Sequence, residues 1–437
     1  MSTIKWAACQ PLVGGMTIAA YQILKTQPEF IITGFASNDQ ECINYFNNTL
    51  NLNVPVITMD SEYQGFLTNA DETLFLKLNV NIDIVNYVPI CSGLSALTTS
   101  CATCKVDNVQ NENQYNLTKF ILKNINPKIA VYENAPALYT ESGKEVLEII
   151  NGIAKDNNYS LTVEKTDTFK HGIPQHRHRT FAYFFKDDFA SYLEYEDIEP
   201  KTLTEYLKEI PKEATAQDIY ADHENAHKDI SYEFVEFCRD EYNKEHGTSE
   251  NIYDMIARYG FNSKKRMSGY EFMERCTGFD KAIDWVENRV KETINQDNNK
   301  SYSSAHRNYI RMKEKVKNNQ RYWDDSSVVS EPWPHVNAVT WKIMKQQKHP
   351  TEDRPLNIRE YAWLMGMPHN FELANWDEWI KLSQNVPVST SRHVAQNCIL
   401  YVQNKLKKSS SKFIKQNNLK QKIDFMEVNK MEELEEW

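Results

Sequence analysis

An apolar run that stops abruptly at a proline and a cysteine constrains this chain more than any other segment. Residues 82–88 are mostly β-branched, aliphatic or aromatic, Pro89 follows, and Cys91 stands at the start of a loop of small residues. This pattern predicts a buried parallel strand with Cys91 just beyond its carboxyl end, the edge at which open α/β sheets bind ligands. A thiol there is a nucleophile if its neighbours stabilise the thiolate, and otherwise it is a small buried apolar side chain.

Strand-like and helix-like segments alternate along the first part of the chain, and this order predicts the fold class. Short apolar runs bounded by turn residues alternate with longer helical segments, as in β-α units whose strands pair in parallel. We therefore expect an α/β fold with a doubly wound, mostly parallel, Rossmann-like sheet. The expected strands are 4–9, 30–36, 54–59, 82–88 and 129–133, and the expected helices are 15–26, 38–48, 114–124 and 142–156.

Three segments further along the chain carry the side chains that could act together with such a thiol. The strand-like run 129–136 ends in Glu133, Asn134 and a proline turn. Residues 175–179 alternate Gln175, Arg177 and Arg179 with two histidines, and strand geometry places these three on one face. Residues 354–371 predict a helix of about two turns that ends at a glycine.

In their order, these segments resemble the motifs of the DNA (cytosine-5) methyltransferase family. The family's Gln-x-Arg-x-Arg motif is matched in full, and the others are matched in part. The similar segments are 89–95 for the Pro-Cys motif, 133–135 for Glu-Asn-Val, 175–179 for Gln-x-Arg-x-Arg, 354–360 for Arg-x-Leu-Thr-x-Arg-Glu, and 384–388 for Gly-Asn-x-Val-Pro. The resemblance covers residues 4–186 and 349–404.

The resemblance implies a catalytic set whose chemistry suits attack on a cytosine ring. Cys91 would attack C6 of the base, and Glu133 would protonate or hydrogen-bond N3. Arg177 and Arg179 would hold the base oxygen and a backbone phosphate. The alternative for the two arginines is a pair of solvated charges at a strand edge. Chemistry on a base requires the nucleotide to leave the duplex, so the implied partner is double-stranded DNA.

The resemblance also implies S-adenosyl-L-methionine as the methyl donor. The residues expected on the donor side are Pro11, Leu12, Gly14, Gly15, Ser37, Asn38, Asp60, Pro89, Asn385 and Val386. The donor side departs from the family pattern at two points. At the first, Leu12 replaces the first glycine of the donor loop. The acid that usually binds the donor ribose falls at Ser37 or Asn38, with Asp39 nearby.

These departures leave three functions open. The first is methyl transfer from S-adenosyl-L-methionine to C5 of a flipped cytosine through a covalent Cys91 adduct. The second keeps the cytosine chemistry but uses a modified sulfonium donor, or an RNA or nucleotide substrate. The third is a catalytically lapsed DNA-binding protein, which would have no need of the complete set of Cys91, Glu133, Arg177 and Arg179.

The remainder of the chain predicts the domain organisation. We expect a catalytic and donor-binding domain at 1–186, a mainly helical inserted target-recognition domain at 187–348, a return segment at 349–404 that completes the first domain, and a tail at 405–437. The tail is expected to form a short helix or to be partly disordered.

Nucleic-acid contacts are expected both beside the thiol and in the recognition domain. The candidates are Ser92, Gly93, Gln175, Lys264, Lys265, Arg266, Arg307 and Arg311. The basic clusters of the recognition domain would follow phosphates or would be solvated helix faces. The net charge of −10 is unusual for a free nucleic-acid binder, so the balance of charge must be local.

Cysteine usage and hydropathy predict the cellular setting. Eight cysteines without regular spacing indicate reduced thiols. Cys101 and Cys104 form a C-x-x-C pair without a second close pair, so we expect a loop and no metal site. With neither a signal peptide nor an apolar run of membrane-spanning length, the expectation is a cytoplasmic or nucleoid-associated protein, away from membranes, as a monomer or weak dimer.

Overall fold

The computed structural model divides the chain into two compact units. It describes residues 3–34, 39–60, 66–67, 81–89, 94, 109–211, 237, 240–249, 280–281, 284–285, 287–288, 291, 336–338, 349–352, 356–372, 379–418 and 424–427. The first unit comprises Met1–Lys201, Glu209–Thr215 and Ala362–Trp437, and the second comprises Thr202–Lys208 and Ala216–Tyr361. The domain boundaries expected from the sequence remain a prediction, and most of the expected recognition domain lies outside the described residues.

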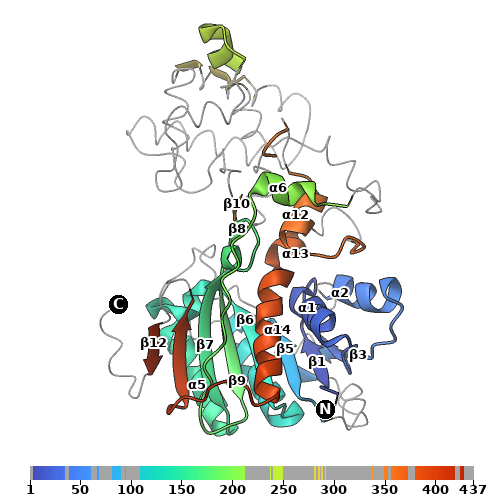
Figure 1. Ribbon diagram of the computed structural model, residues 1–437, viewed down its shortest axis with the longest axis vertical. Helices are drawn as coiled ribbons and strands as arrows, with labels where there is room; N and C mark the ends of the chain where they lie inside the picture. Colours follow the sequence, from blue (N-terminus) through green and yellow to red (C-terminus); the bar gives the residue numbers. More distant parts are fainter. Residues whose placement is uncertain are drawn as a thin grey trace. The chain divides into compact units, whose positions relative to one another are not determined.

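The first unit is built on a mostly parallel sheet that, within the described residues, has ten strands (Figure 1). Their order is β12-β11-β7-β9-β6-β5-β1-β2-β3-β4. The strands are β1 (Trp6–Cys9), β2 (Ile31–Thr33), β3 (Val56–Asp60), β4 (Phe66–Leu67), β5 (Ile84–Tyr87), β6 (Ile129–Asn134), β7 (Ser160–Asp167), β9 (His178–Phe185), β11 (Phe413–Asn417) and β12 (Asp424–Glu427). Strands β4, β9 and β12 run antiparallel to their neighbours. The predicted doubly wound, mostly parallel α/β fold is confirmed.

The order of the strands places a ligand-binding edge between β1 and β5. The chain passes outward from β1 to β2 and β3, and then returns to pair β5 with the other side of β1. Ligands of open α/β sheets bind at such a switch point, beyond the carboxyl ends of the strands. The loop after β1 holds Gly14 and Gly15, and the loop after β5 begins at Val88 and Pro89. Both predicted halves of the site therefore start at this edge.

Helices cover both faces of the sheet, which explains why the residues of its central strands β1, β5 and β6 are all buried. Helices α1 (Gly15–Leu24) and α14 (Val388–Val402) pack on one face, and Figure 1 shows α14 crossing in front of the strands. Helices α4 (Val109–Phe120) and α5 (Lys144–Asp156) belong to the other face. Because side chains alternate along a strand, β5 sends Val85 to the layer of α4 and α5, and Ile84 to α1 and α14.

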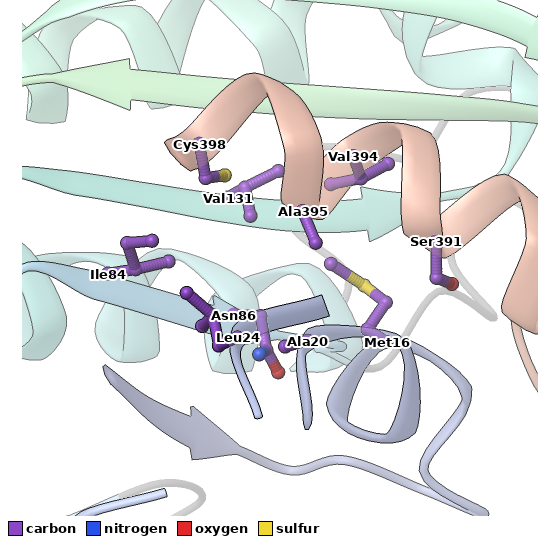
Figure 2. Close-up of a pocket in the computed structure, with 10 residues that line it drawn as sticks. All are labelled: Met16, Ala20, Leu24, Ile84, Asn86, Val131, Ser391, Val394, Ala395 and Cys398. Atoms are coloured by element: carbon purple, nitrogen blue, oxygen red, sulfur yellow. The ribbon is translucent and has the colours of Figure 1, made fainter. Parts of the chain in front are cut away.

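A small cavity lies between α1, α14 and the sheet (Figure 2). It is lined mainly by apolar side chains, including Met16, Val131 and Val394, and its volume of about 10 Å³ is close to that of one water-sized sphere. The cavity is a gap in side-chain packing and is too small to hold a nucleoside. This cavity is therefore not a candidate for the functional site.

The remaining described helices, turns and strands are short. In the first unit they are α2 (Gln40–Asn44), a π-helical turn (Tyr45–Thr49), a second π-helical turn (Ile121–Ile125), 3-10 turns (Pro136–Tyr139, Glu141–Gly143 and Thr168–Lys170), β8 (Gln175–His176) and α13 (Trp379–Gln384). The second unit contains α6 (Leu203–Lys208) and β10 (Val336–Asn337), and α12 (Ile358–Leu364) begins in it.

The segment expected to form a helix near residue 358 does begin one there, at the start of α12. Asn357 and Glu360 form a reciprocal capping box in the second unit. The backbone N–H of Asn357 donates to Oε2 of Glu360 at 2.8 Å, and the N–H of Glu360 donates to Oδ1 of Asn357 at 2.9 Å. At the other end, Gly366 has a φ of 67°, as a glycine that terminates a helix requires. The helix predicted here is therefore present.

The tail differs from its prediction. Residues 413–417 form β11, which pairs in parallel with β7, and β12 pairs with β11. Its apolar residues Phe413 and Ile414 are buried in the first unit. The sequence suggested a helix or disorder because the run is short and flanked by lysines and serines. Pairing with a strand some 250 residues earlier overrides that local composition.

Candidate active site

A buried ion pair joins two of the predicted catalytic residues at the carboxyl end of β6. Glu133 lies on β6, and β9 runs antiparallel beside it, so that Glu133 is opposite Phe181 in register. This pairing brings Arg179, at the start of β9, to the same edge of the sheet. The Nε atom of Arg179 lies 2.5 Å from Oε1 of Glu133, and the Glu133 side chain is only 3% exposed.

The surroundings of Glu133 favour proton donation. Burial raises the pKa of its carboxyl group above the usual range, and the charges of Arg179 and Arg177 oppose that rise. A carboxyl group with a raised pKa holds its proton closer to neutral pH, as a general acid must. The arrangement can therefore supply a proton or a hydrogen bond to a ring nitrogen placed beside it.

Asp167, at the end of β7, organises the Gln-x-Arg-x-Arg segment. Its Oδ1 atom accepts hydrogen bonds from the backbone N–H groups of Arg177 at 2.9 Å and Phe169 at 3.2 Å. Its Oδ2 atom lies 2.7 Å from Nδ1 of His176 and 3.2 Å from Nε2 of His178. Burial acts to raise the pKa of Asp167, but the two histidines hold it below its usual range. Asp167 was not among the site residues predicted from the sequence, although an acid at a strand end shortly before two histidines was the available signal.

The side chains of Gln175 and Arg177 are buried and bonded to backbone carbonyl groups. Gln175 is fully buried, and its side-chain amide donates to the carbonyl oxygen of Leu364 at 3.1 Å. Arg177 is 1% exposed, and its Nη2 atom donates to the carbonyl oxygens of Ser383 at 2.8 Å and Asn385 at 2.9 Å. Both had been predicted to contact nucleic acid or the base. Residues of the segments 364–367 and 383–388 accept these hydrogen bonds and so cover the two side chains.

The loop after β1 has an unusual backbone. Gln10 has a φ of 46°, Leu12 of 53° and Gly14 of 100°. Only the last of these is a residue that adopts the left-handed region at no steric cost. Leu12, which stands where the family pattern has a glycine, thus adopts a conformation that glycine accepts without strain. The hydrogen bond from Gly14 N–H to the carbonyl oxygen of Pro11, at 2.9 Å, closes the turn.

Asp39 holds this loop against the end of β2. Its Oδ1 atom accepts from the N–H of Leu12 at 2.8 Å, and its Oδ2 atom accepts from the N–H of Gly34 at 2.7 Å. The side chain is buried, and this burial raises its pKa to about 7. From the sequence, Asp39 was predicted only to lie near the expected ribose-binding position. Its actual partners are backbone groups, which no sequence pattern identifies.

The start of α1 is packed against the segment that follows α13. The N–H of Gly15 donates to Oδ1 of Asn385 at 2.8 Å, and both residues are buried. A Cβ atom built on Gly15 would lie 1.8 Å from the carbonyl oxygen of Val386, so only glycine fits there. The predicted donor-side residue Gly15 is therefore in contact with Asn385 and Val386, although Asn385 lies 370 residues later in the sequence.

The other predicted site residues are placed in part or not at all. Pro89 is buried just after β5, and Pro11 is buried in the loop after β1. Asp60 ends β3, although its side chain is not described. The predicted residues outside the described part of the chain are Ser37, Asn38, Cys91, Ser92, Gly93, Lys264, Lys265, Arg266, Arg307 and Arg311.

Neither a metal-binding cluster nor a membrane-spanning helix is found among the described residues. No three histidine, cysteine, aspartate or glutamate side chains among them are grouped so that they could hold a metal ion. Within the same residues, no helix combines the length and the apolar character needed to cross a membrane.

Comparison with known proteins identifies the family. Two solved structures share the fold over 92% of this chain and 99% of theirs. One, described as a candidate DNA modification methyltransferase encoded within a prophage (E. coli), has a TM-score of 0.54 at 14% identity; the other, the Entamoeba histolytica methyltransferase EhMeth, has 0.50 at 11%. No curated protein matches this chain in sequence. The model of the C-5 cytosine-specific DNA methylase family matches residues 13–400. The chain therefore belongs to the C-5 cytosine-specific DNA methylase family.

Proposed function

We propose that this protein methylates C5 of a flipped cytosine in double-stranded DNA, with Cys91 as nucleophile and S-adenosyl-L-methionine as methyl donor. The observation that carries the proposal is the buried Glu133–Arg179 pair. The pair lies at the carboxyl end of β6, next to β5, and Cys91 follows the end of β5 by four residues in the sequence. A buried acid with a raised pKa and an arginine fork are the two groups needed to activate and orient the ring.

Cys91, Glu133 and Arg179 account for the activation of the cytosine ring. The Cys91 thiolate forms a bond to C6 while Glu133 supplies a proton or hydrogen bond at N3, which places electron density on C5. C5 would then take the methyl group as the sulfonium centre leaves as a neutral thioether. Loss of the C5 proton to a base would let the C6–S bond break and return the thiolate. Arg179 stabilises the Glu133 carboxylate and, through its remaining N–H groups, can orient the base oxygen.

The donor side is supported by the geometry of the loop after β1. S-adenosyl-L-methionine would supply an electrophilic methyl group on a sulfonium centre. The tight turn at Gly14 and the amino end of α1 suit the carboxylate of the donor, and the acidic residue Asp60 at the end of β3 suits a hydrogen-bond donor of its nucleoside.

One observation favours a second candidate, a cytosine C5-modifying enzyme with a modified sulfonium donor. Asp39 is the described acid nearest the end of β2. It is 1% exposed, and both of its oxygens already accept hydrogen bonds from backbone N–H groups. The carboxylate is therefore directed into the protein and not toward donor hydroxyls, so the ribose-binding part of the donor site differs from the family pattern.

The test is covalent trapping on DNA that contains 5-fluorocytosine. Because fluorine does not leave C5 as a proton does, methyl transfer should stall with the protein attached to the base. The expected result is an intact mass, under denaturing conditions, of protein plus DNA plus one methyl group. Cys91→Ala should give no adduct, while Cys398→Ala, at a buried cysteine of α14 that is not among the predicted donor or base contacts, should give the full mass.

Two control arms separate the alternatives. An RNA oligonucleotide with the same modified base replaces the DNA in one arm, and an adduct formed only there would overturn DNA as the substrate. Small molecules that co-purify with the protein are identified in the other arm, where a modified sulfonium compound would overturn the unmodified donor. Tight DNA binding without an adduct under any of these conditions would support a catalytically lapsed binder.

A further inference from the structure

The guanidinium group of Arg177 is connected to the loop after β1 through one intermediate residue. Arg177 donates to the carbonyl oxygen of Asn385, and the side chain of Asn385 accepts the N–H of Gly15. Gly15 is the first residue of α1 and immediately follows the donor turn. Two successive hydrogen bonds thus connect the Gln-x-Arg-x-Arg segment to the donor loop.

The connection is rigid because every member is buried and multiply bonded. Arg177 and Asn385 are each 1% exposed, and the carbonyl oxygen of Ser383 accepts a second bond from the same guanidinium group. Two bonds from one planar group fix the turn at 383–385 and thereby the direction of the Asn385 side chain. The side-chain amide of Asn385 is held on its other side by the sulfur of Met367, at 3.2 Å.

A second set of contacts joins the same segments. Gln175, two residues before Arg177, donates to the carbonyl oxygen of Leu364, and the N–H of Val388 donates to the carbonyl oxygen of Met365 at 2.9 Å. The segments 364–367 and 383–388 are thereby tied both to β8 and to each other. A displacement at β8 would be transmitted to the segment that contacts Gly15.

We infer that Arg177 is a positioning residue for the methyl donor, acting through Asn385 and Gly15, and not a contact to the base or to phosphate. The inference rests on the proposed function for the identity of the donor. Its physical basis is that a buried guanidinium group already bonded to backbone carbonyls contributes preorganisation of the loop, which lowers the cost of ordering it when the donor binds. Arg179 alone of the pair then faces Glu133 and the base.

The inference is tested by measuring donor affinity in the absence of nucleic acid. Titration calorimetry with S-adenosyl-L-methionine should show about tenfold weaker binding for Arg177→Lys, because one ammonium group cannot replace the fork on both carbonyls. Asn385→Ala should weaken binding by a similar factor, and the double variant should lose less than the product of the two effects. Arg179→Lys is the matched control and should bind the donor as the wild type does.

Hydrogen exchange at Gly15 provides a readout that does not depend on the donor or on turnover. Without any ligand, a peptide that spans the start of α1 should exchange faster in Arg177→Lys than in the wild type, and its rate in Arg179→Lys should be unchanged. Unaltered exchange together with unaltered donor affinity in Arg177→Lys would overturn the inference. If the wild type does not bind S-adenosyl-L-methionine, the proposed donor is overturned instead, and the exchange rates alone decide the role of Arg177.

Discussion

The guanidinium group of Arg179 and the carboxyl group of Glu133 meet across two antiparallel strands at 2.5 Å, with the carboxyl group almost completely removed from solvent. Burial raises the pKa of Glu133, and Arg179 limits the rise. The pair therefore balances two requirements, because the acid must hold a proton for N3 and still be stable inside the protein. Changes to either partner should shift this balance in a measurable direction.

Removing the proton of Glu133 should abolish most of the activity. Glu133→Gln keeps the size and one hydrogen-bond acceptor but cannot protonate N3, so kcat should fall about 10²- to 10⁴-fold. Methyl incorporation into DNA measures the loss, and Glu145→Gln, at an exposed glutamate of α5, is the control that should retain full activity. Normal turnover in Glu133→Gln would exclude Glu133 as the proton donor.

Neutralising Arg179 should move the pH profile upward. Because the charge of Arg179 lowers the pKa of Glu133, Arg179→Gln should raise that pKa further. A proton donor is lost as the pH rises through its pKa, so the basic limb of the rate of adduct formation should shift to higher pH in the variant. The absolute rate should fall as well, since the fork on the base is lost. A basic limb that stays in place would show that Glu133 does not set it.

The left-handed backbone at Leu12 should make glycine the better residue there for stability. A non-glycine residue in this region costs about 1 kcal/mol or more, and a β-branched one costs more still. Leu12→Gly should be neutral or stabilising by up to about 1 kcal/mol, whereas Leu12→Val should be destabilising by about 1–2 kcal/mol. Urea unfolding at one pH compares the two, and a more stable valine variant would contradict the strain at Leu12.

The buried His171 should make the protein less stable in mild acid. Burial lowers its pKa from 6.5 to about 3, the charge of His393 adds to this, and Glu164 and Asp167 oppose it. Between these two values the unfolded chain binds a proton that the folded chain does not. The free energy of unfolding should therefore fall with pH below about 6.5, by up to about 1.4 kcal/mol per unit from this residue.

The variant His171→Gln isolates that contribution. Its side chain can still bond to the hydroxyl of Thr166, which lies 2.8 Å from Nε2 of His171, but it cannot titrate. Urea unfolding of the wild type and the variant at pH 7.5, 6 and 5 should give a smaller loss of stability with acid in the variant. Equal slopes in the two proteins would show that His171 is not protonated on unfolding.

Short motifs in the right order predicted the fold and the family of this chain from its sequence. Both main signals are local: the apolar run at 82–88 that ends at Pro89 and Cys91, and the complete Gln-x-Arg-x-Arg segment. They can therefore be recognised without knowing what they contact. The doubly wound sheet followed from the same local rules, whereas the approach of Arg179 to Glu133 depends on the antiparallel pairing of β6 with β9.

The partners of individual side chains were decided only by the tertiary structure. Alternation assigns Arg177 and Arg179 to one face alike, but Arg177 is covered by Ser383 and Asn385, while Arg179 reaches Glu133. Asp39 likewise bonds to the backbone of Leu12 and Gly34, and the tail becomes a strand beside β7. Local sequence sets periodicity and turn chemistry, whereas burial depends on which distant segment packs on a given face, and that is a property of the whole chain.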